Sequence, residues 1–338
     1  MKQQSLSIAL PNPGQWQEVA DDVFWIRMPL PFELDHINLY LLRDGDNFVL
    51  VDTGIHTKVT RQLWEQLFET YKITLSKIIV THMHPDHIGN AGWLCEHFRI
   101  PLLMSHMEYF IARSIRAGDQ GASHWEDEEH LVRCGLDQQH IERSMANRDG
   151  IKHVVSPIPV RFTRLVAGQT LEIDQHKWSV MIGRGHSPEH VCLYDAERKL
   201  LISGDHVLPH ISPNIGVYST EPEANALKLY LDTLPQFLKL PEDTLVLPSH
   251  KLPFHGLHER VNQLLQHHQE HLTVLLNFCQ TERTLVDCLP VMFDRELNHQ
   301  SMFFAVAECL SHLNYLWFQG SIIRKLREDG VYVYQVAN

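Results

Sequence analysis

Short apolar runs alternate with longer amphipathic stretches through the first three quarters of the chain. The runs are rich in β-branched and aromatic residues, which predicts strands. They fall at residues 23–28, 37–43, 48–52 and 77–81 in a first group, and at 178–182, 191–195, 200–203 and 244–247 in a second. Apolar residues at helical spacing predict helices over 57–71 and 88–98. Consecutive strands, followed by strands that alternate with helices, favour mixed sheets covered by helices, an α+β fold.

A stretch between the two strand groups, residues 106–147, has the helical pattern throughout. Its predicted helices cover 107–115, 124–133 and 137–145. The stretch is predicted to be an insertion into the sheet framework. The pattern leaves two interpretations open, a packing appendage or a lid over a pocket.

The pattern changes after Gly256. The predicted elements are, in order, helices over 257–278, 284–293 and 301–318, and a hairpin formed by 321–327 and 331–336. Helix, helix and β-hairpin is the order of a winged-helix module. The predicted organisation is a first domain over residues 1–255 and a helical, winged-helix-like C-terminal domain over 256–338.

Composition places the chain among globular proteins. Of its 338 residues, 44% are hydrophobic and 21% are charged, which excludes a disordered or collagen-like chain. No stretch approaches the roughly 20 unbroken apolar residues that a bilayer crossing needs. Residues 1–14 lack an apolar core after a basic start, so we expect no secretory signal and no membrane partner. Six cysteines without a CxxC pair predict reduced thiols and a cytoplasmic location.

Charge and histidine content sharpen this picture. The formal net charge of −12 disfavours broad binding to phosphate backbones, although it leaves room for a local basic groove. Histidine is unusually frequent, with 24 residues against 29 Lys plus Arg. Because many histidines serve no chemistry, their spacing has to identify the ones that do.

The densest group of ligand-type side chains directly follows a predicted strand. The segment Thr81-His82-Met83-His84-Pro85-Asp86-His87 places three imidazoles and one carboxylate within six residues. A loop at a strand end can aim several side chains at one point, and imidazole with carboxylate suits Zn²⁺ and similar ions. Three further candidates adjoin strand-like sequence, namely His186, Asp205 and His250. The alternative, a histidine-rich surface loop, does not account for these three.

The order of these motifs carries a family resemblance. The pattern HxHxDH, then Gly185-His186, then Ser203-Gly204-Asp205, then a late His250, resembles the metallo-β-lactamase superfamily over roughly residues 16–255. The resemblance implies an αββα sandwich with a metal site at one edge. It also implies a hydrolase with two metal ions per chain, Zn²⁺ by default and Fe or Mn as alternatives.

The resemblance also implies roles for particular residues. The first ion would be held by His82, His84 and His186, and the second by Asp86, His87 and His250. Asp205 would bridge the two ions, and Asp86 would also be a catalytic proton shuttle. Asp52, in Val51-Asp52-Thr53-Gly54, would orient a ligand histidine, and His190 would support a ligand rather than bind metal.

Other polar residues near these motifs have weaker signals. His206 and His210 are candidate substrate contacts for which structural packing is the default. His36 and Asn38 precede a strand that borders the site in the family. The cluster His267-His268 and His271 lacks acidic partners at useful spacing, which predicts a solvated helix face.

The metal motifs fix a mechanism but not a substrate. Two cations that flank a water lower its pKa and create a hydroxide that attacks a carbonyl or phosphorus. The GxSxG elbow, the P-loop and the Rossmann fingerprint are absent. Three function classes remain: hydrolysis of a small ester or thioester, as in the glyoxalase II and acyl-thioesterase branches; endoribonuclease activity; and transcription regulation through the winged helix with a structural metal site.

The tail helps to choose among these classes. Residues 256–338 contain six Lys plus Arg and nine Asp plus Glu, and the predicted helix 301–318 has no Lys or Arg. A helix that reads nucleic acid needs cations for phosphates. We therefore expect a small-molecule substrate, with the nuclease as runner-up and nucleic acid disfavoured as a partner. The insertion and the tail are predicted to wall the metal cleft, and burial against a second subunit is the alternative.

Overall fold

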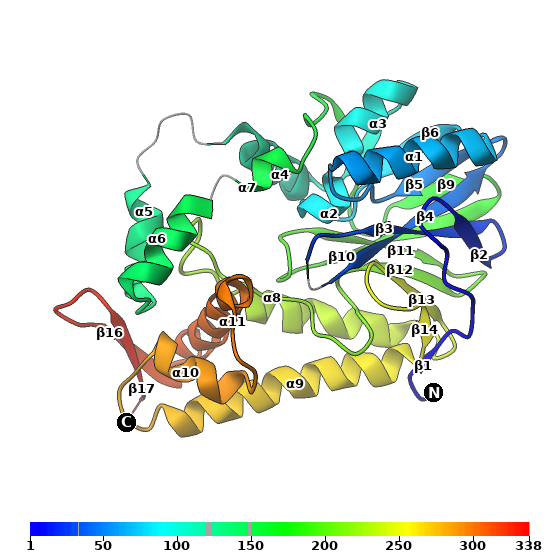
Figure 1. The fold of residues 1–338 in the computed structure, drawn as a ribbon. Helices are drawn as coiled ribbons and strands as arrows, with labels where there is room; N and C mark the ends of the chain where they lie inside the picture. Colours follow the sequence, from blue (N-terminus) through cyan, green and yellow to red (C-terminus); the bar gives the residue numbers. More distant parts are fainter. Residues whose placement is uncertain (33, 119–123, 148–149, 338) are drawn as a thin grey trace.

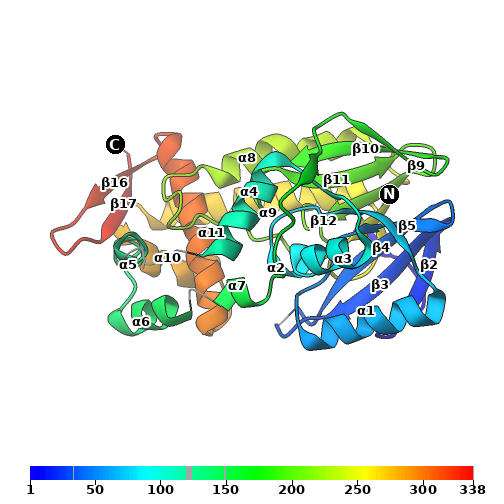
Figure 2. The same ribbon diagram turned by 90° about the horizontal axis from the view of Figure 1, so that it is seen from above.

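Two seven-stranded sheets face each other, and helices cover the outer side of each sheet (Figures 1 and 2). This is a computed structural model, and it describes residues 1–32, 34–118, 124–147 and 150–337. The layered arrangement confirms the predicted α+β sandwich. Within the described ranges, no helix has both the length and the apolar character needed to cross a bilayer. All six cysteines are buried and unpaired.

The first sheet is antiparallel at one end and parallel at the other. Its strands are, in spatial order, β2 (Trp16–Ala20), β3 (Val23–Pro29), β4 (His36–Asp44), β5 (Asn47–Val51), β6 (Leu75–Ile79), β7 (Leu102–Met104) and β8 (Phe162–Arg164). β5 and β6 run parallel with Val51 opposite Ile79. The carboxyl ends of these two strands therefore reach the same edge of the sheet.

The second sheet is antiparallel except for one pair of neighbouring strands. Its strands are, in spatial order, β1 (Gln4–Ser5), β14 (Phe254–His255), β13 (Leu245–Pro248), β12 (Leu200–Gly204), β11 (His190–Asp195), β10 (His176–Gly183) and β9 (Thr170–Ile173). β12 and β13 run parallel with Ile202 opposite Leu247. The strands at or next to the sheet edges, β1, β2, β7, β8, β9 and β14, were not predicted.

Three apolar layers hold the sheets and helices together. Trp25, Tyr40 and Trp178 are buried between the two sheets. Outside the first sheet lie α1 (Lys58–Tyr71), α2 (Pro85–Ile88), α3 (Ala91–Phe98) and α4 (His106–Ala117). α1 begins after Thr57, whose hydroxyl accepts a hydrogen bond from the Thr60 amide, and it buries Trp64 and Leu67. The single helix predicted over 88–98 is interrupted at Gly89–Asn90.

The outer layer of the second sheet continues into the C-terminal module. Its elements are α8 (Ala226–Thr233), the 3₁₀ helix η1 (Leu234–Lys239), α9 (Leu257–Phe278), β15 (Arg283–Thr284), α10 (Leu285–Met292), α11 (His299–Phe318), β16 (Ile322–Leu326) and β17 (Tyr332–Val336). One apolar cluster joins Leu227, Phe254, Leu289 and Leu313. The predicted domains thus share a core; their boundary at 255/256 and the winged-helix assignment stay predictions.

The insertion touches both parts of the molecule. It contains α4, α5 (Trp125–Arg133) and α6 (Gln138–Asn147), and its residues 119–123 lie outside the described residues. After it, α7 (Gly150–His153) leads back to the sheet. α4 buries Tyr109 and Ala112 against the first sheet. α5 lies against the C-terminal module, where the Arg133 guanidinium donates to the Tyr332 hydroxyl at 3.1 Å.

Candidate metal centre

The loops that follow the central strands converge at one edge of the sandwich. His82 and His84 lie between β6 and α2, and Asp86 and His87 lie on α2. His186 lies between β10 and β11, Asp205 directly follows β12, and His250 follows β13. A backbone hydrogen bond connects the two sheets at this edge. The Val191 amide, on β11, donates to the Thr81 carbonyl, which follows β6, at 2.8 Å. Six of the seven predicted ligands therefore follow strands of the parallel pairs, and His186 reaches the same edge from the connection between the antiparallel strands β10 and β11.

One group of ligand atoms comprises His82, His84, His186 and Asp205, all within 4.8 Å of one another. His82 Nε2 lies 2.8 Å from His84 Nδ1 and 3.2 Å from His186 Nε2. Asp205 Oδ2 lies 3.6 Å from His186 Nε2. Four ligand atoms at this spacing surround a volume that suits one cation.

A second group comprises Asp86, His87 and His250, also within 4.8 Å of one another. His250 Nε2 lies 3.4 Å from Asp86 Oδ2 and 3.4 Å from Asp205 Oδ1. His87 Nε2 lies 3.5 Å from the same Asp205 oxygen. The carboxylate of Asp205 thus turns one oxygen toward each group, which is the geometry that the predicted bridging role requires.

The buried polar atoms of this edge fit two divalent cations. His87 Nε2 and Asp205 Oδ1 are buried, and neither has a hydrogen-bond partner in the described part of the chain. Burial opposes protonation of His250, but Asp205 and Asp86 outweigh it and raise the pKa of His250 to about 10. Burial lowers the pKa of His84 to about 3. The carboxylates of Asp86 and Asp205 therefore favour positive charge in the second group. The first group offers neutral imidazoles, which is the form that binds metal.

Carboxylate and hydroxyl groups behind the ligands fix their orientation. Asp52, which directly follows β5, accepts from His87 Nδ1 at 2.8 Å. The Thr81 amide and hydroxyl also donate to Asp52, at 2.8 Å each. His87 Nε2 is thereby left free to face the centre. The contact agrees with the role predicted for Asp52 as the carboxylate that orients a ligand histidine.

Three other sequence candidates also support the ligand loops. His190 Nε2 accepts from the Asp205 amide at 3.1 Å, so this side chain holds the loop that carries Asp205. The His36 carbonyl accepts from His250 Nδ1 at 2.9 Å. Asn38 donates to the Pro248 and Lys251 carbonyls on either side of the same ligand.

The remaining histidines divide into two kinds. His206 is buried between the rings of Tyr230 and Phe237, in agreement with the default packing role, and His210 is exposed. The prediction of a solvated face for His267, His268 and His271 is wrong. His268 is fully buried, because α11 covers this face of α9.

Two residues that the sequence did not single out adjoin the centre. Glu108, on α4, is fully buried and accepts from the Met83 amide, the Ser187 hydroxyl and the Glu189 amide at 3.0, 2.7 and 2.7 Å. Burial raises its pKa to about 7, against these hydrogen bonds. The backbone carbonyl of Asn214 accepts from His186 Nδ1 at 2.8 Å. A glutamate on an amphipathic helix and an asparagine in a loop carry no signal of their own in the sequence.

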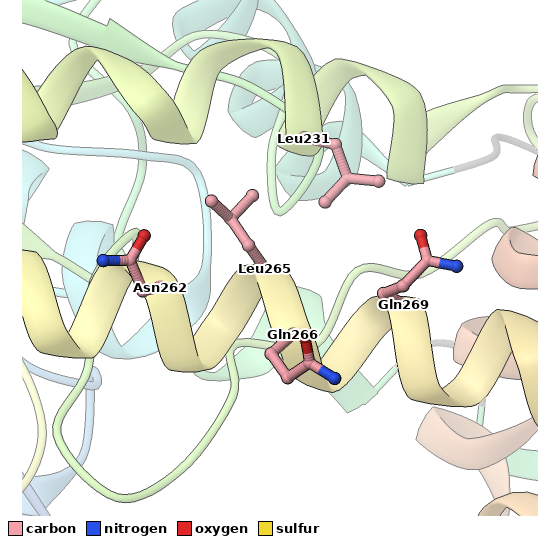
Figure 3. A pocket seen from close by; sticks show the side chains of 5 residues that line it. All are labelled: Leu231, Asn262, Leu265, Gln266 and Gln269. Atoms are coloured by element: carbon pink, nitrogen blue, oxygen red, sulfur yellow. The ribbon is translucent and has the colours of Figure 1, made fainter.

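A groove between α8 and α9 is lined by other residues, namely Leu231, Asn262, Leu265, Gln266 and Gln269 (Figure 3). It contains none of the seven ligand candidates and no titratable side chain. We therefore assign no chemistry to this groove.

Two family profiles match the chain. Residues 33–250 match the metallo-beta-lactamase superfamily, and residues 272–337 match the metallo-beta-lactamase-like C-terminal domain. The first match contains the seven ligand candidates. The second covers most of the module that follows the sandwich.

Individual proteins are similar over most or part of the chain. A beta-lactamase domain protein from Burkholderia ambifaria has 40% identity and a TM-score of 0.91, covering 98% of this chain and 97% of its own. The probable metallo-hydrolase YqjP of Bacillus subtilis is 22% identical, over 93% of this chain and 98% of its own length. The acyl-coenzyme A thioesterase MBLAC2 of Bos taurus is 26% identical over 56% of this chain and 65% of its own length.

Proposed function

The chain belongs to the metallo-beta-lactamase superfamily, and from this premise we propose that it is a metal-dependent hydrolase of a small thioester or ester. His82, His84 and His186 would hold one ion, and Asp86, His87 and His250 the other, with Asp205 between them. Two such ions supply an activated water near neutral pH and a Lewis acid for the carbonyl oxygen. Zn²⁺ is the default for this ligand set, with Fe or Mn as alternatives.

Asp86 is the candidate for proton transfer. Burial opposes its ionisation, but His87 and His250 outweigh burial and lower the pKa of Asp86 to about 2. The carboxylate is therefore ionised at neutral pH, and its oxygens can accept a proton from the attacking water. Its Oδ2 lies 3.4 Å from His250 Nε2, within the second ligand group.

Exposed apolar side chains on two helices that are connected to the His186 loop support the choice of substrate. Glu108 of α4 accepts from the Ser187 hydroxyl in that loop, and the same helix exposes Phe110, by 50%. α11 exposes Phe304, by 44%, and the backbone carbonyl of Phe304 accepts from the Asn214 side chain at 3.1 Å. The backbone carbonyl of Asn214 in turn accepts from His186 Nδ1. Apolar walls around a few polar groups are what a small acyl substrate requires.

The names of relatives favour a thioester over other small esters as the substrate. MBLAC2 is named an acyl-coenzyme A thioesterase, and its similarity covers about half of this chain. An endoribonuclease would instead need Lys and Arg along the groove, and α11 has neither. A small molecule is therefore the proposed partner, and a homo-oligomer stays a prediction.

A substrate panel tests this proposal. After metal analysis, the purified protein would be assayed with acyl thioesters, lactones, phosphodiesters and short RNAs. We expect thioester turnover that a chelator removes and added Zn²⁺, Fe²⁺ or Mn²⁺ restores. Salt-sensitive cleavage of RNA without turnover of any thioester or ester would contradict the proposal and favour the nuclease.

Phe304→Ala should weaken substrate binding without affecting the metal centre. Loss of one aromatic wall costs about 1.5–3 kcal/mol of apolar burial, so we expect KM for an acyl thioester to rise at least about tenfold. kcat and metal content should stay near wild type, because the side chain is exposed and touches no ligand. The measurement is steady-state kinetics on thioesters of increasing acyl length.

Phe318→Ala is the matched control for this variant. Phe318 is similarly exposed, at 52%, and lies on the same helix about 20 Å farther along the axis. Its replacement should leave KM unchanged. An equal effect of both variants would show that the apolar face of α11 does not form the substrate wall.

A further inference from the structure

We propose that the C-terminal module holds an additional divalent-metal site, made by His268 of α9 with Glu308 and His312 of α11. These side chains are distinct from the seven of the dinuclear centre, and the proposal stands whether or not that centre hydrolyses thioesters. The ligand class is two imidazoles and one carboxylate, which suits Zn²⁺ or another divalent transition metal.

The ligand atoms have the spacing of a metal site. One atom each from His268, Glu308 and His312 lies within 4.8 Å of the others. His268 Nδ1 and His312 Nε2 are 3.1 Å apart, compared with 2.8 and 3.2 Å for the imidazole pairs of the dinuclear centre. Two nitrogens bound to one tetrahedral Zn²⁺ at roughly 2.0–2.1 Å lie roughly 3.3 Å apart.

A hydrogen bond behind the cluster fixes the orientation of one ligand. His312 Nδ1 donates to the Glu308 carbonyl one turn earlier in α11, at 2.8 Å. The proton is therefore on Nδ1, and the lone pair of Nε2 faces His268. Metal-binding histidines are commonly oriented in this way, by donation of the other ring nitrogen to a carbonyl or carboxylate.

The cluster is buried and lacks a compensating charge. His268 and His312 are fully buried, and Glu308 is 8% exposed. Within the described part of the chain, Glu308 forms no ion pair with Lys or Arg; its side-chain partner is the neutral amide of Asn214, at 3.3 Å. A buried carboxylate without a counter-ion is costly, and a divalent cation would supply that charge.

A neighbouring group extends the site. His267, His271 and Glu308 also offer one ligand atom each within 4.8 Å. Buried His271 Nδ1 has no hydrogen-bond partner among the described residues. His271 is therefore a candidate for a fourth ligand, which places four histidines and one glutamate between two packed helices.

The alternative is a metal-free hydrogen bond from His268 Nδ1 to His312 Nε2 beside a protonated Glu308. The two arrangements differ in metal stoichiometry. In the full chain saturated with Zn²⁺ and freed of loose metal by gel filtration, we expect three equivalents by mass spectrometry. The variant His84→Ala/His250→Ala, which removes a ligand from each group of the dinuclear centre, should retain one equivalent.

Adding Glu308→Gln to that variant should remove the last equivalent. This change keeps the side-chain shape and a partner for Asn214, so loss of folding does not obscure the result. With Co²⁺ in place of Zn²⁺, the visible absorption of the remaining site should vanish in the same step. His258→Gln, on the same helix and outside the cluster, is the control and should leave the count unchanged. Two results would overturn the proposal. One is that the metal equivalent remains after Glu308→Gln is added, and the other is that the His84→Ala/His250→Ala variant binds no metal at all.

Discussion

Asp205→Ala should abolish hydrolysis while the protein stays folded. Asp205 turns Oδ2 toward His186 and Oδ1 toward His87 and His250, so its removal takes away the group shared by both halves of the centre. Burial opposes ionisation of Asp205, but His250 and His87 outweigh burial and hold its pKa well below the usual range. The side chain is therefore an anion that would offset the charge of both ions. Loss of one preorganised electrostatic group costs about 10²–10³-fold in kcat, and loss of shared metal binding adds to that.

Kinetics at saturating metal, together with metal content and circular dichroism, would measure the effect. Asp205→Asn is the graded variant, since it keeps one oxygen but loses the charge, and we expect intermediate metal content. Asp195→Asn is the matched control, because Asp195 is also buried but pairs with Arg198 at the opposite end of β11. It should lower stability and keep both ions. Full activity of Asp205→Ala with two ions bound would disprove the bridging role.

Glu108→Ala should lower the metal affinity of the centre, although Glu108 is not one of the ligand candidates. The Glu108 carboxylate accepts from Met83, between two ligands, and from Ser187 and Glu189, beside a third. It therefore binds the His82–His84 loop to the His186 loop. Two partly buried amides and the buried Ser187 hydroxyl would lose their acceptor, and a buried unsatisfied donor costs about 1–3 kcal/mol. Loss of such a supporting group typically costs 10–100-fold in metal affinity, and we expect an effect of about that size on the first ion.

A comparison of metal affinity with stability would identify Glu108 as a positioning residue. Its removal should leave an enzyme whose kcat recovers as free Zn²⁺ is raised, which a merely destabilised protein would not do. Glu108→Gln is the matched variant: it keeps one acceptor oxygen but turns an amide N–H toward one donor, so a smaller loss of affinity is expected. Unchanged metal affinity in Glu108→Ala, with only a lower melting temperature, would contradict this role.

The local elements could be predicted because their signals lie within a few residues. The strands β3, β4 and β5 and the helix α9 fall where the apolar patterns placed them, since burial of one face imposes a period on the sequence. Short strands such as β7 and β8 were missed because three residues are too few to display a period. They form because neighbouring strands supply their hydrogen bonds.

The ligand set could be anticipated for a related reason. Four of the seven candidates lie within six residues, and the others adjoin strand ends, so the sequence itself limits where they can meet. The order of the motifs was specific enough to identify the superfamily. It did not determine the distances, because these depend on the parallel register of β5 with β6 and of β12 with β13.

The sequence by itself therefore determined the fold class, the superfamily and the candidate ligands, because each depends on local periodicity or on a compact motif. Asp52 and His190 were anticipated as supporting residues, and only the tertiary structure decided which polar residues outside the motifs support the ligands. Glu108 reaches the ligand loops because α4 packs across the strand ends, and His268 is buried because α11, about forty residues later in the chain, covers its face of α9. Which face of a helix is covered depends on partners distant in sequence, and no local pattern records them.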